Sequence, residues 1–136
     1  MKRIKLGILG CGGAALSIHL PVLHRLRDKY ELVAVCDQSS NRAVETAKKY
    51  GIGKNFSSLE EMLQDSFDML LILTLNHEEA IDKRLEAQEH IFTEKPISLD
   101  LDSSCALCKK AKKVGLTLNV RLMRFYDPMI KQLNQK

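Results

Sequence analysis

The sequence predicts an α/β fold, in which a doubly wound parallel sheet carries helices on both faces. Short apolar segments alternate with longer segments of helical periodicity along the whole chain. The run Met69–Leu73 is continuously apolar, as expected for a central parallel strand that is covered on both sides. A glycine-rich turn, Gly10–Ala15, directly follows the first strand. Right-handed crossovers between such strands place the helices outside the sheet.

Local signals define the elements of the first half of the chain. Pro21 is expected to kink the first helix because it lacks an N–H and its ring disturbs the preceding turn. Gly51 marks the end of the second helix, and Ser57 or Ser58 is expected to cap a third. The predicted elements are a strand Ile4–Leu9, a helix Ala14–Lys29, a strand Glu31–Cys36, a helix Asn41–Tyr50, a strand Ile52–Phe56 and a helix Ser58–Gln64.

The second half continues the same alternation. Acidic Asp100 and Asp102 mark the start of a helix, where the helix dipole favours negative charge, and Gly115 ends that helix. The predicted elements are a strand Met69–Thr74, a helix Glu78–Glu89, a strand His90–Thr93, a helix Leu101–Val114, a strand Thr117–Val120 and a helix that opens at Asp127-Pro128 and runs through Gln132.

The glycine-rich turn has the chemistry of a dinucleotide-binding motif. Gly10 permits a tight turn off the strand, and Gly12 lacks the Cβ that would hold a diphosphate away from backbone N–H groups. The helix that follows presents unpaired N–H groups and the positive end of its dipole. The candidate cofactor residues of this turn are Gly10, Cys11, Gly12, Gly13 and Ala14.

Asp37 directly follows the second predicted strand, slightly beyond the usual interval of about 20 residues after the motif. A carboxylate there can accept both ribose hydroxyls, and it would repel a 2′-phosphate. We therefore expect NAD, with NADP as the alternative. The glycine motif alone would also fit a plain tight turn, but strand, motif, helix, strand and acid in this order favour a dinucleotide site.

Length and composition fit one globular domain. The 136 residues are 45% hydrophobic and 28% charged. The net charge of +4 is scattered, and the densest basic cluster, Lys109 to Lys113, fits a solvated helix face. With 5% aromatic residues and no interleaved basic stripe, we expect no nucleic-acid partner. No apolar run reaches the roughly 20 residues that span a bilayer, so we expect no membrane partner and a cytoplasmic location.

The cysteines and histidines suggest no metal site. Cys105 and Cys108 form a C-x-x-C within a helical pattern, and packed, reduced thiols are favoured over redox or metal chemistry. His19, His24 and His90 have no metal-like spacing or carboxylate partner in the sequence, which favours surface or packing roles.

Several motifs in order identify a family resemblance. They are Gly10-Cys11-Gly12-Gly13, Ala34-Val35-Cys36-Asp37, Leu73-Thr74-Leu75-Asn76-His77, Glu94-Lys95-Pro96 and Arg124-Phe125-Tyr126-Asp127-Pro128. Together they resemble the N-terminal NAD(P)-binding Rossmann domain of the Gfo/Idh/MocA oxidoreductases, the family of glucose-fructose oxidoreductase and inositol dehydrogenase. The resemblance extends over essentially the whole chain, and the Glu-Lys-Pro element is its most specific part.

The resemblance implies roles for the Glu-Lys-Pro element. Lys95 is the implied active-site lysine, Glu94 helps to position the nicotinamide end of the cofactor, and Pro96 shapes the turn. An ammonium beside a carbinol can stabilise the charge that develops on oxygen as hydride moves to nicotinamide. Without the family, an ordinary surface pair of Glu94 and Lys95 is the alternative.

The resemblance also implies that Thr74, Asn76 and His77 line the ribose and pyrophosphate. Leu75 stands where the family usually has proline, and a helix-capping or solvent-facing role is the alternative for His77. Arg42 matches a family arginine that can contact adenine or an adenosine phosphate, and its alternative is a solvated helix position. Gln88 replaces a glycine that the family favours before the fifth strand.

The family resemblance implies a second, larger domain that binds the sugar or polyol and supplies a proton-transferring histidine. We expect that this substrate domain is absent, so that residues 1–136 are a cofactor domain that is catalytically incomplete alone. The alternatives are a stand-alone module that binds or senses a dinucleotide without turnover, and a structural domain with a vestigial pocket. An uncovered sheet edge and last helix would favour self-association.

Overall fold

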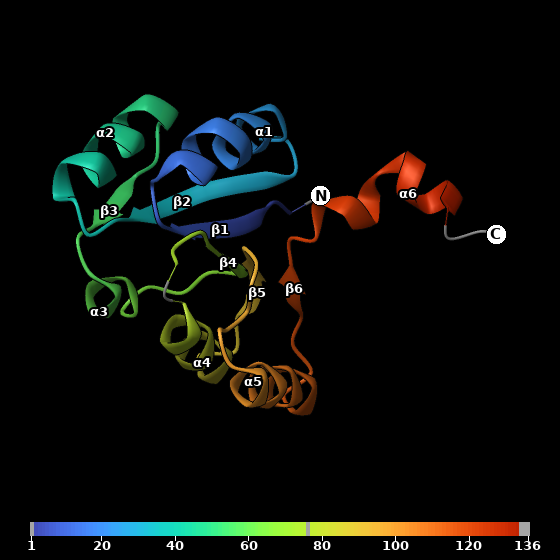
Figure 1. Ribbon diagram of the computed structural model, residues 1–136. Coiled ribbons are helices and arrows are strands. Elements are labelled where there is room, and N and C mark those ends of the chain that lie inside the picture. Colours follow the sequence, from blue (N-terminus) through green and yellow to red (C-terminus); the bar gives the residue numbers. More distant parts are fainter. Residues whose placement is uncertain (1, 76, 134–136) are drawn as a thin grey trace.

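A computed structural model describes residues 2–75 and 77–133. They form a six-stranded sheet in the order β3-β2-β1-β4-β5-β6, in which every pairing is parallel (Figure 1). The strands are β1 (Ile4–Leu9), β2 (Tyr30–Cys36), β3 (Lys54–Phe56), β4 (Met69–Ile72), β5 (His90–Thr93) and β6 (Leu118–Val120). The strand order reverses between β1 and β4, which confirms the predicted doubly wound sheet and creates a switch point there.

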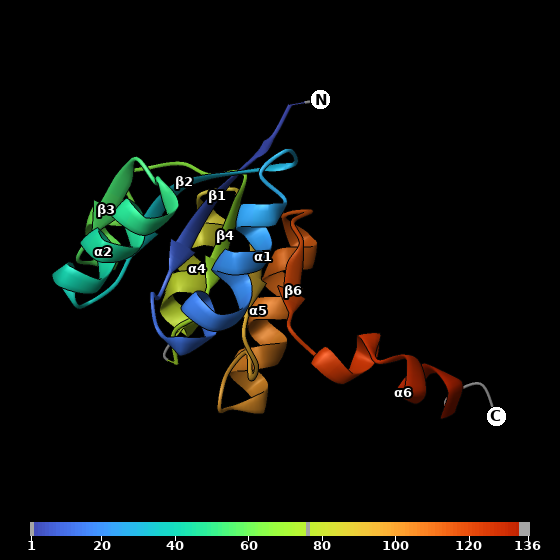
Figure 2. The same ribbon diagram turned by 90° about the horizontal axis from the view of Figure 1, so that it is seen from above.

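Helices cover both faces of the sheet (Figures 1 and 2). A π-helical segment η1 (Ala15–His19), α1 (Leu20–Arg25) and α2 (Ser40–Tyr50) lie on one face, and α3 (Leu59–Met62), α4 (Glu78–Glu86) and α5 (Leu101–Lys113) lie on the other. Each face has its own buried core, with Ile8 and Leu20 on the first and Leu70 and Leu85 on the second.

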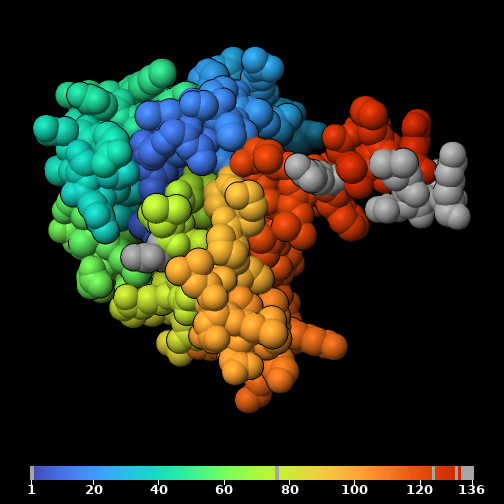
Figure 3. All heavy atoms as spheres, in the orientation of Figure 1, coloured from blue at the N-terminus to red at the C-terminus, as the bar shows by residue number. Residues whose placement is uncertain are grey.

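The chain after β6 leaves the body of the domain. A 3₁₀ turn η2 (Met123–Tyr126) and a short helix α6 (Pro128–Leu133) form an arm that projects from the sheet, drawn in red in the space-filling view (Figure 3). Large apolar side chains on this arm are exposed, including Phe125 and Met129. The predicted last helix is therefore present, and the exposed Phe125 and Met129 side chains belong to neither buried core.

The first helix is shorter and less regular than the predicted Ala14–Lys29. The Leu20 N–H bonds to the Ala15 carbonyl in a widened π turn, and α1 ends at Arg25. Pro21 directly follows the widened turn, has no N–H to continue the ladder, and would press its ring against the carbonyl four residues earlier. The predicted kink thus takes the form of a π turn, and residues 26–29 form a turn instead of a helix.

The predicted helix ends at Ser58, Asp100 and Gly51 are confirmed. Ser58 and Asp100 accept backbone N–H bonds at the starts of α3 and α5, and Gly51 adopts the left-handed conformation after α2. Ser39 caps α2 in the same way, which the sequence analysis did not predict. Several predicted element ends were too late. The structure ends α3 at Met62, β4 at Ile72, α4 at Glu86 and α5 at Lys113.

The end of α4 contains a strained residue. Gln88 has φ +61°, the only positive φ of a non-glycine residue in the described chain. Gln88→Gly is expected to raise the free energy of unfolding by about 0.5–1 kcal/mol, because glycine adopts this conformation without a Cβ clash. Urea denaturation measures the change. Gln64→Gly, where φ is not positive, is the matched control, and an unchanged or lower stability of the Gln88 variant would contradict the assignment.

The exposed C-x-x-C corrects one expectation. Cys105 and Cys108 both lie on the exposed side of α5, so they are not packed thiols, whereas Cys11 and Cys36 are buried.

Within the described chain, no group of three metal-ligating side chains lies together. Likewise, none of the described helices combines the length and the apolar character that crossing a membrane requires.

Candidate functional site

A groove of about 750 Å³ lies at the carboxyl ends of β1, β2 and β4. Its walls include Gly10, Gly12, Asp37, Arg42 and Thr74, which the sequence analysis had placed at a cofactor site. These residues meet because the carboxyl ends of parallel strands share one edge of the sheet, and the groove opens at the switch point of the strand order.

The glycine turn has different requirements at its two key positions. Gly10 has φ +101°, and a Cβ there would lie 3.1 Å from the Leu73 carbonyl carbon and 3.2 Å from its oxygen. Only glycine fits. A Cβ at Gly12 or Gly13 would meet nothing within 4 Å. Gly12 also lines the groove, so a side chain there would occupy groove space without disturbing the protein.

Asp37 ties the glycine turn to the end of β2. Its Oδ2 accepts the Cys11 N–H at 2.9 Å, and its Oδ1 accepts the Ser39 N–H at 2.8 Å. The Arg42 Nε lies 3.4 Å from Oδ1, on a side chain that is 55% exposed. Each carboxylate oxygen keeps a further lone pair. Asp37 therefore has a structural role that the sequence analysis missed, beside the predicted role at the ribose.

The two buried thiols, Cys11 in the glycine turn and Cys36 at the end of β2, are chemically unreactive. Burial raises the pKa of the Cys36 thiol to about 12 and also raises the pKa of the Cys11 thiol. Because the thiolate is the reactive form, both cysteines stay neutral and inert near neutral pH.

The loop after β4 presents an unsatisfied hydroxyl. Thr74 Oγ1 is buried and has no hydrogen-bond partner within the described residues. Such groups are rare in folded proteins, so a bound ligand is one natural partner. Asn76, the next predicted cofactor residue, lies outside the described residues.

His77 is buried and connects two loops. Its Nδ1 lies 2.7 Å from the Thr74 carbonyl oxygen, and its Nε2 lies against the Pro96 carbonyl oxygen. Carbonyl oxygens only accept, so a ring nitrogen bonds its carbonyl as an N–H donor. The ring stands at the N-cap of α4 without a side-chain capping bond. His77 is therefore neither helix-capping nor solvent-facing, and it joins the loop after β4 to the Lys95-Pro96 turn.

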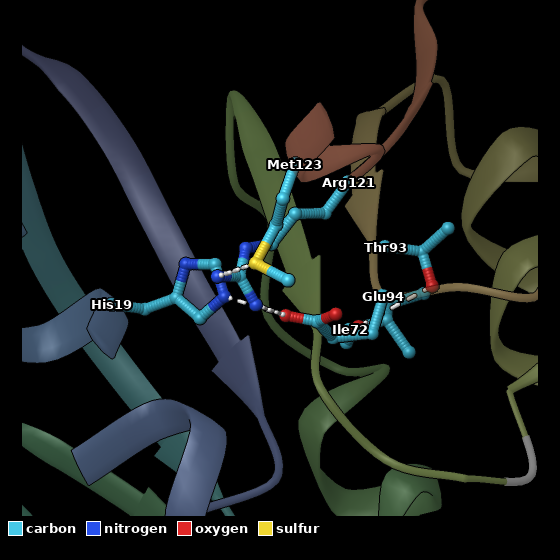
Figure 4. Close-up of polar contacts among 6 residues, drawn as sticks. All are labelled: His19, Ile72, Thr93, Glu94, Arg121 and Met123. Atoms are coloured by element: carbon cyan, nitrogen blue, oxygen red, sulfur yellow. Dashed lines mark hydrogen bonds and ion pairs between the residues drawn. The ribbon is translucent and has the colours of Figure 1, made fainter. Parts of the chain in front are cut away.

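Glu94 is the centre of a cluster of charged and polar side chains (Figure 4). Its Oε1 accepts from His19 Nε2 at 2.9 Å and from Arg121 Nη1 at 2.8 Å. Burial alone would raise the pKa of the Glu94 carboxyl, but the hydrogen bonds from His19 and Arg121 outweigh it and hold the pKa below its usual range. The expectation that His19 lacks a carboxylate partner was therefore wrong.

Lys95 follows Glu94 but does not pair with it. Its side chain is exposed and makes no hydrogen bond or ion pair with any residue that the structure describes. Glu94 is already engaged by His19 and Arg121, so the alternative of an ordinary Glu94–Lys95 surface pair does not hold. The ammonium group of Lys95 is left available at the same sheet edge as the groove.

The comparison with protein families decides the relationship of this chain. The Gfo/Idh/MocA model, described as an oxidoreductase family with an NAD-binding Rossmann fold, matches residues 4–122. The chain belongs to this family. The Rossmann fold and the family resemblance predicted from the motifs are thereby confirmed.

Relatives of the chain include characterised enzymes. The scyllo-inositol 2-dehydrogenase (NAD(+)) of Bacillus subtilis is 37% identical over 101 residues, which cover 72% of this chain and 30% of that enzyme. The 3-ketoreductase KijD10 of Actinomadura kijaniata, solved with NADP and TDP-benzene, has 26% identity and a TM-score of 0.87, over 98% of this chain and 42% of that one.

A second solved structure is the WlbA dehydrogenase of Chromobacterium violaceum with NADH and UDP-GlcNAcA. It has 25% identity and a TM-score of 0.91, over 99% of this chain and 39% of that one. The chain thus spans less than half of the length of these relatives. These two solved structures hold NADP and NADH, the predicted cofactor class.

Within this Gfo/Idh/MocA domain, the predicted residues form two groups. The glycine turn, Asp37, Arg42 and Thr74 surround the groove, while Glu94 and Lys95 follow β5. Sequence reasoning missed His19 and Arg121. The predicted topology offered a signal for Arg121, because it directly follows the strand that pairs with β5. No comparable local signal marks His19.

Proposed function

We propose that this chain binds NAD(H) in the groove, as the cofactor domain of an oxidoreductase that moves hydride between nicotinamide and a sugar or polyol hydroxyl. The glycine turn is the observation that carries the proposal. Gly10 has no room for a Cβ, whereas Gly12 borders open groove space where backbone N–H groups can meet a diphosphate.

The chain's residues fit a dinucleotide along its length. The backbone of Gly10–Ala14 would hold the pyrophosphate, and the unpaired Thr74 hydroxyl would gain a partner there. The free lone pairs of Asp37 would accept ribose hydroxyls, with Arg42 beside them at the adenosine end. Bound NAD would supply the hydride acceptor.

Lys95 is the proposed active-site lysine. Its unpaired ammonium would hold the substrate hydroxyl and stabilise negative charge on that oxygen. The substrate class is proposed from the relatives, whose names include an inositol dehydrogenase and enzymes solved with sugar-nucleotide ligands or analogues. Residues 1–136 are proposed to be incomplete as a catalyst, because Lys95 has no hydrogen-bonded partner among the described residues that could take up the hydroxyl proton.

A second candidate function is dinucleotide binding or sensing without turnover. The exposed position of Lys95, which makes no hydrogen bond or ion pair with a described residue, favours this candidate for the chain by itself. Neither candidate predicts reduction of NAD by the chain alone when inositols and sugars are offered as substrates. Turnover by the chain alone would reject both the sensing function and the proposed incompleteness.

Calorimetric titration with NAD, NADH and NADPH tests the proposed function directly. We expect saturable binding of each, with NAD(H) tighter than NADPH because of the Asp37 carboxylate. A folded sample that binds none of the three would contradict the proposal and indicate a vestigial pocket.

Asp37→Ala is expected to weaken NAD about tenfold or more, since hydrogen bonds to a charged acceptor are lost, and to weaken NADP less. The variant also leaves the buried Cys11 N–H without its acceptor, which costs about 1–3 kcal/mol of stability. Titrations well below the melting temperature separate the two effects. Glu45→Ala, an exposed acid on α2, is the control. Equal losses for NAD and NADP would contradict the ribose assignment.

A further inference from the structure

The cluster around Glu94 connects three parts of the chain that are distant in sequence. His19 comes from η1, Glu94 from the end of β5, and Arg121 from the end of β6 (Figure 4). We propose that His19 and Arg121 are positioning residues for the nicotinamide end of the site, because they hold Glu94, and with it the Lys95 turn, in a fixed place relative to the glycine turn. This inference rests on the proposed function.

Both donors converge on one oxygen. Glu94 Oε1 accepts from His19 and Arg121, while Oε2 has no partner among the described residues. The donors are themselves held in place. The His19 ring packs edge-on against Phe92, with centroids 5.6 Å apart, and Arg121 Nη2 lies 2.8 Å from the Met123 sulfur. The carboxylate therefore has one preferred orientation, with Oε2 left for another partner.

The backbone around Glu94 is fixed as well. The Glu94 N–H donates to the Ile72 carbonyl at 3.2 Å, and the Arg121 N–H donates to the Thr93 carbonyl at 2.9 Å. These bonds tie the end of β5 to β4 on one side and to β6 on the other. Because η1 begins directly after Ala14, His19 adds a side-chain link from the glycine turn to the residue that precedes Lys95.

The cluster also keeps the Glu94 carboxylate from pairing with the side chain of Lys95. The side chains of His19, Glu94 and Arg121 are only 11%, 17% and 19% exposed, so the charges of Glu94 and Arg121 are poorly screened. Removal of either donor would leave the carboxylate held by one bond only, so that it could turn toward the adjacent Lys95 ammonium. His19 and Arg121 thus act through Glu94 and leave Lys95 unpaired for a substrate hydroxyl.

Titration with two ligands tests the inference. ADP-ribose contains the diphosphate and both riboses but no nicotinamide, so it reports only on the other end of the site. His19→Ala and Arg121→Ala are each expected to weaken NADH about tenfold and to change ADP-ribose affinity less than twofold. His19→Gln, whose amide can still donate to Glu94, is expected to recover most of the NADH affinity.

Controls separate this role from folding and from the proposed function. His24→Ala, on the neighbouring helix α1 and packed against Tyr50, should change neither affinity. Equal losses for NADH and ADP-ribose, or no loss for either, would overturn the positioning role even if a variant is less stable. A folded wild-type chain that binds neither ligand would instead overturn the proposed function, and this inference with it.

Discussion

Gly12→Val is expected to reduce dinucleotide affinity by about 100-fold or more and to leave the fold intact. The added Cβ would meet no protein atom within 4 Å, so the domain itself tolerates a side chain at this position. The isopropyl group would instead fill the groove that Gly12 borders and keep the diphosphate from the backbone N–H groups of the turn. Calorimetry measures the affinity, and circular dichroism with a thermal melt measures the fold.

Two other glycines make this test specific. Gly53→Val also places its Cβ in open space, away from the groove, and should retain full affinity. Gly10→Ala should destabilise the domain, because its Cβ would press against the Leu73 carbonyl at positive φ. Unchanged NADH affinity in Gly12→Val would reject the groove as the cofactor site. Gly12→Ala provides a smaller obstruction, with an expected intermediate loss.

The fold was predictable because its signals are local. The continuous apolar run at Met69 to Leu73 marked the central strand, and Ser58 and Gly51 marked helix ends through their own backbone bonds. The first helix was predicted less well. Its π turn before Pro21 forms because the Leu20 N–H bonds to the Ala15 carbonyl, five residues earlier. The spacing of apolar residues does not indicate where a helix will form such a π turn next to a residue without an N–H.

The residues of the candidate site also fall into those that local sequence signals predicted and those that they did not. The glycine turn and Asp37 carry recognisable chemistry in a short span, whereas the significance of Glu94 and Lys95 came from the family resemblance. The His19–Glu94 contact joins residues 75 positions apart, so no local pattern could reveal it. The second role of Asp37, as acceptor for the Cys11 N–H, also depends on the tertiary meeting of β1 and β2.

A buried ion pair of Arg84 and Glu89 is the other feature that the sequence did not reveal. Their side chains are 0% and 2% exposed, with Nη1 of Arg84 3.0 Å from Oε1 of Glu89. Arg84 also donates to the Asp65 and Met62 carbonyls, and Glu89 accepts the Phe67 N–H. The pair therefore holds the end of α4 against the segment that leads into β4. Charged residues are expected on the surface, so the sequence did not predict that Arg84 and Glu89 form a buried ion pair.

Arg84→Ala is expected to lower the free energy of unfolding by about 3–5 kcal/mol, because Glu89 would stay buried without its counter-charge. Urea denaturation measures the loss. Lys83→Ala removes a neighbouring surface ion pair with Glu79 and should leave stability nearly unchanged. If the pair is coupled as the geometry indicates, Glu89→Gln should be less harmful in an Arg84→Met background than in the wild type, since no unpaired charge remains. Additive losses, or a small effect of Arg84→Ala, would show that water reaches this ion pair and that it does not hold α4 in place.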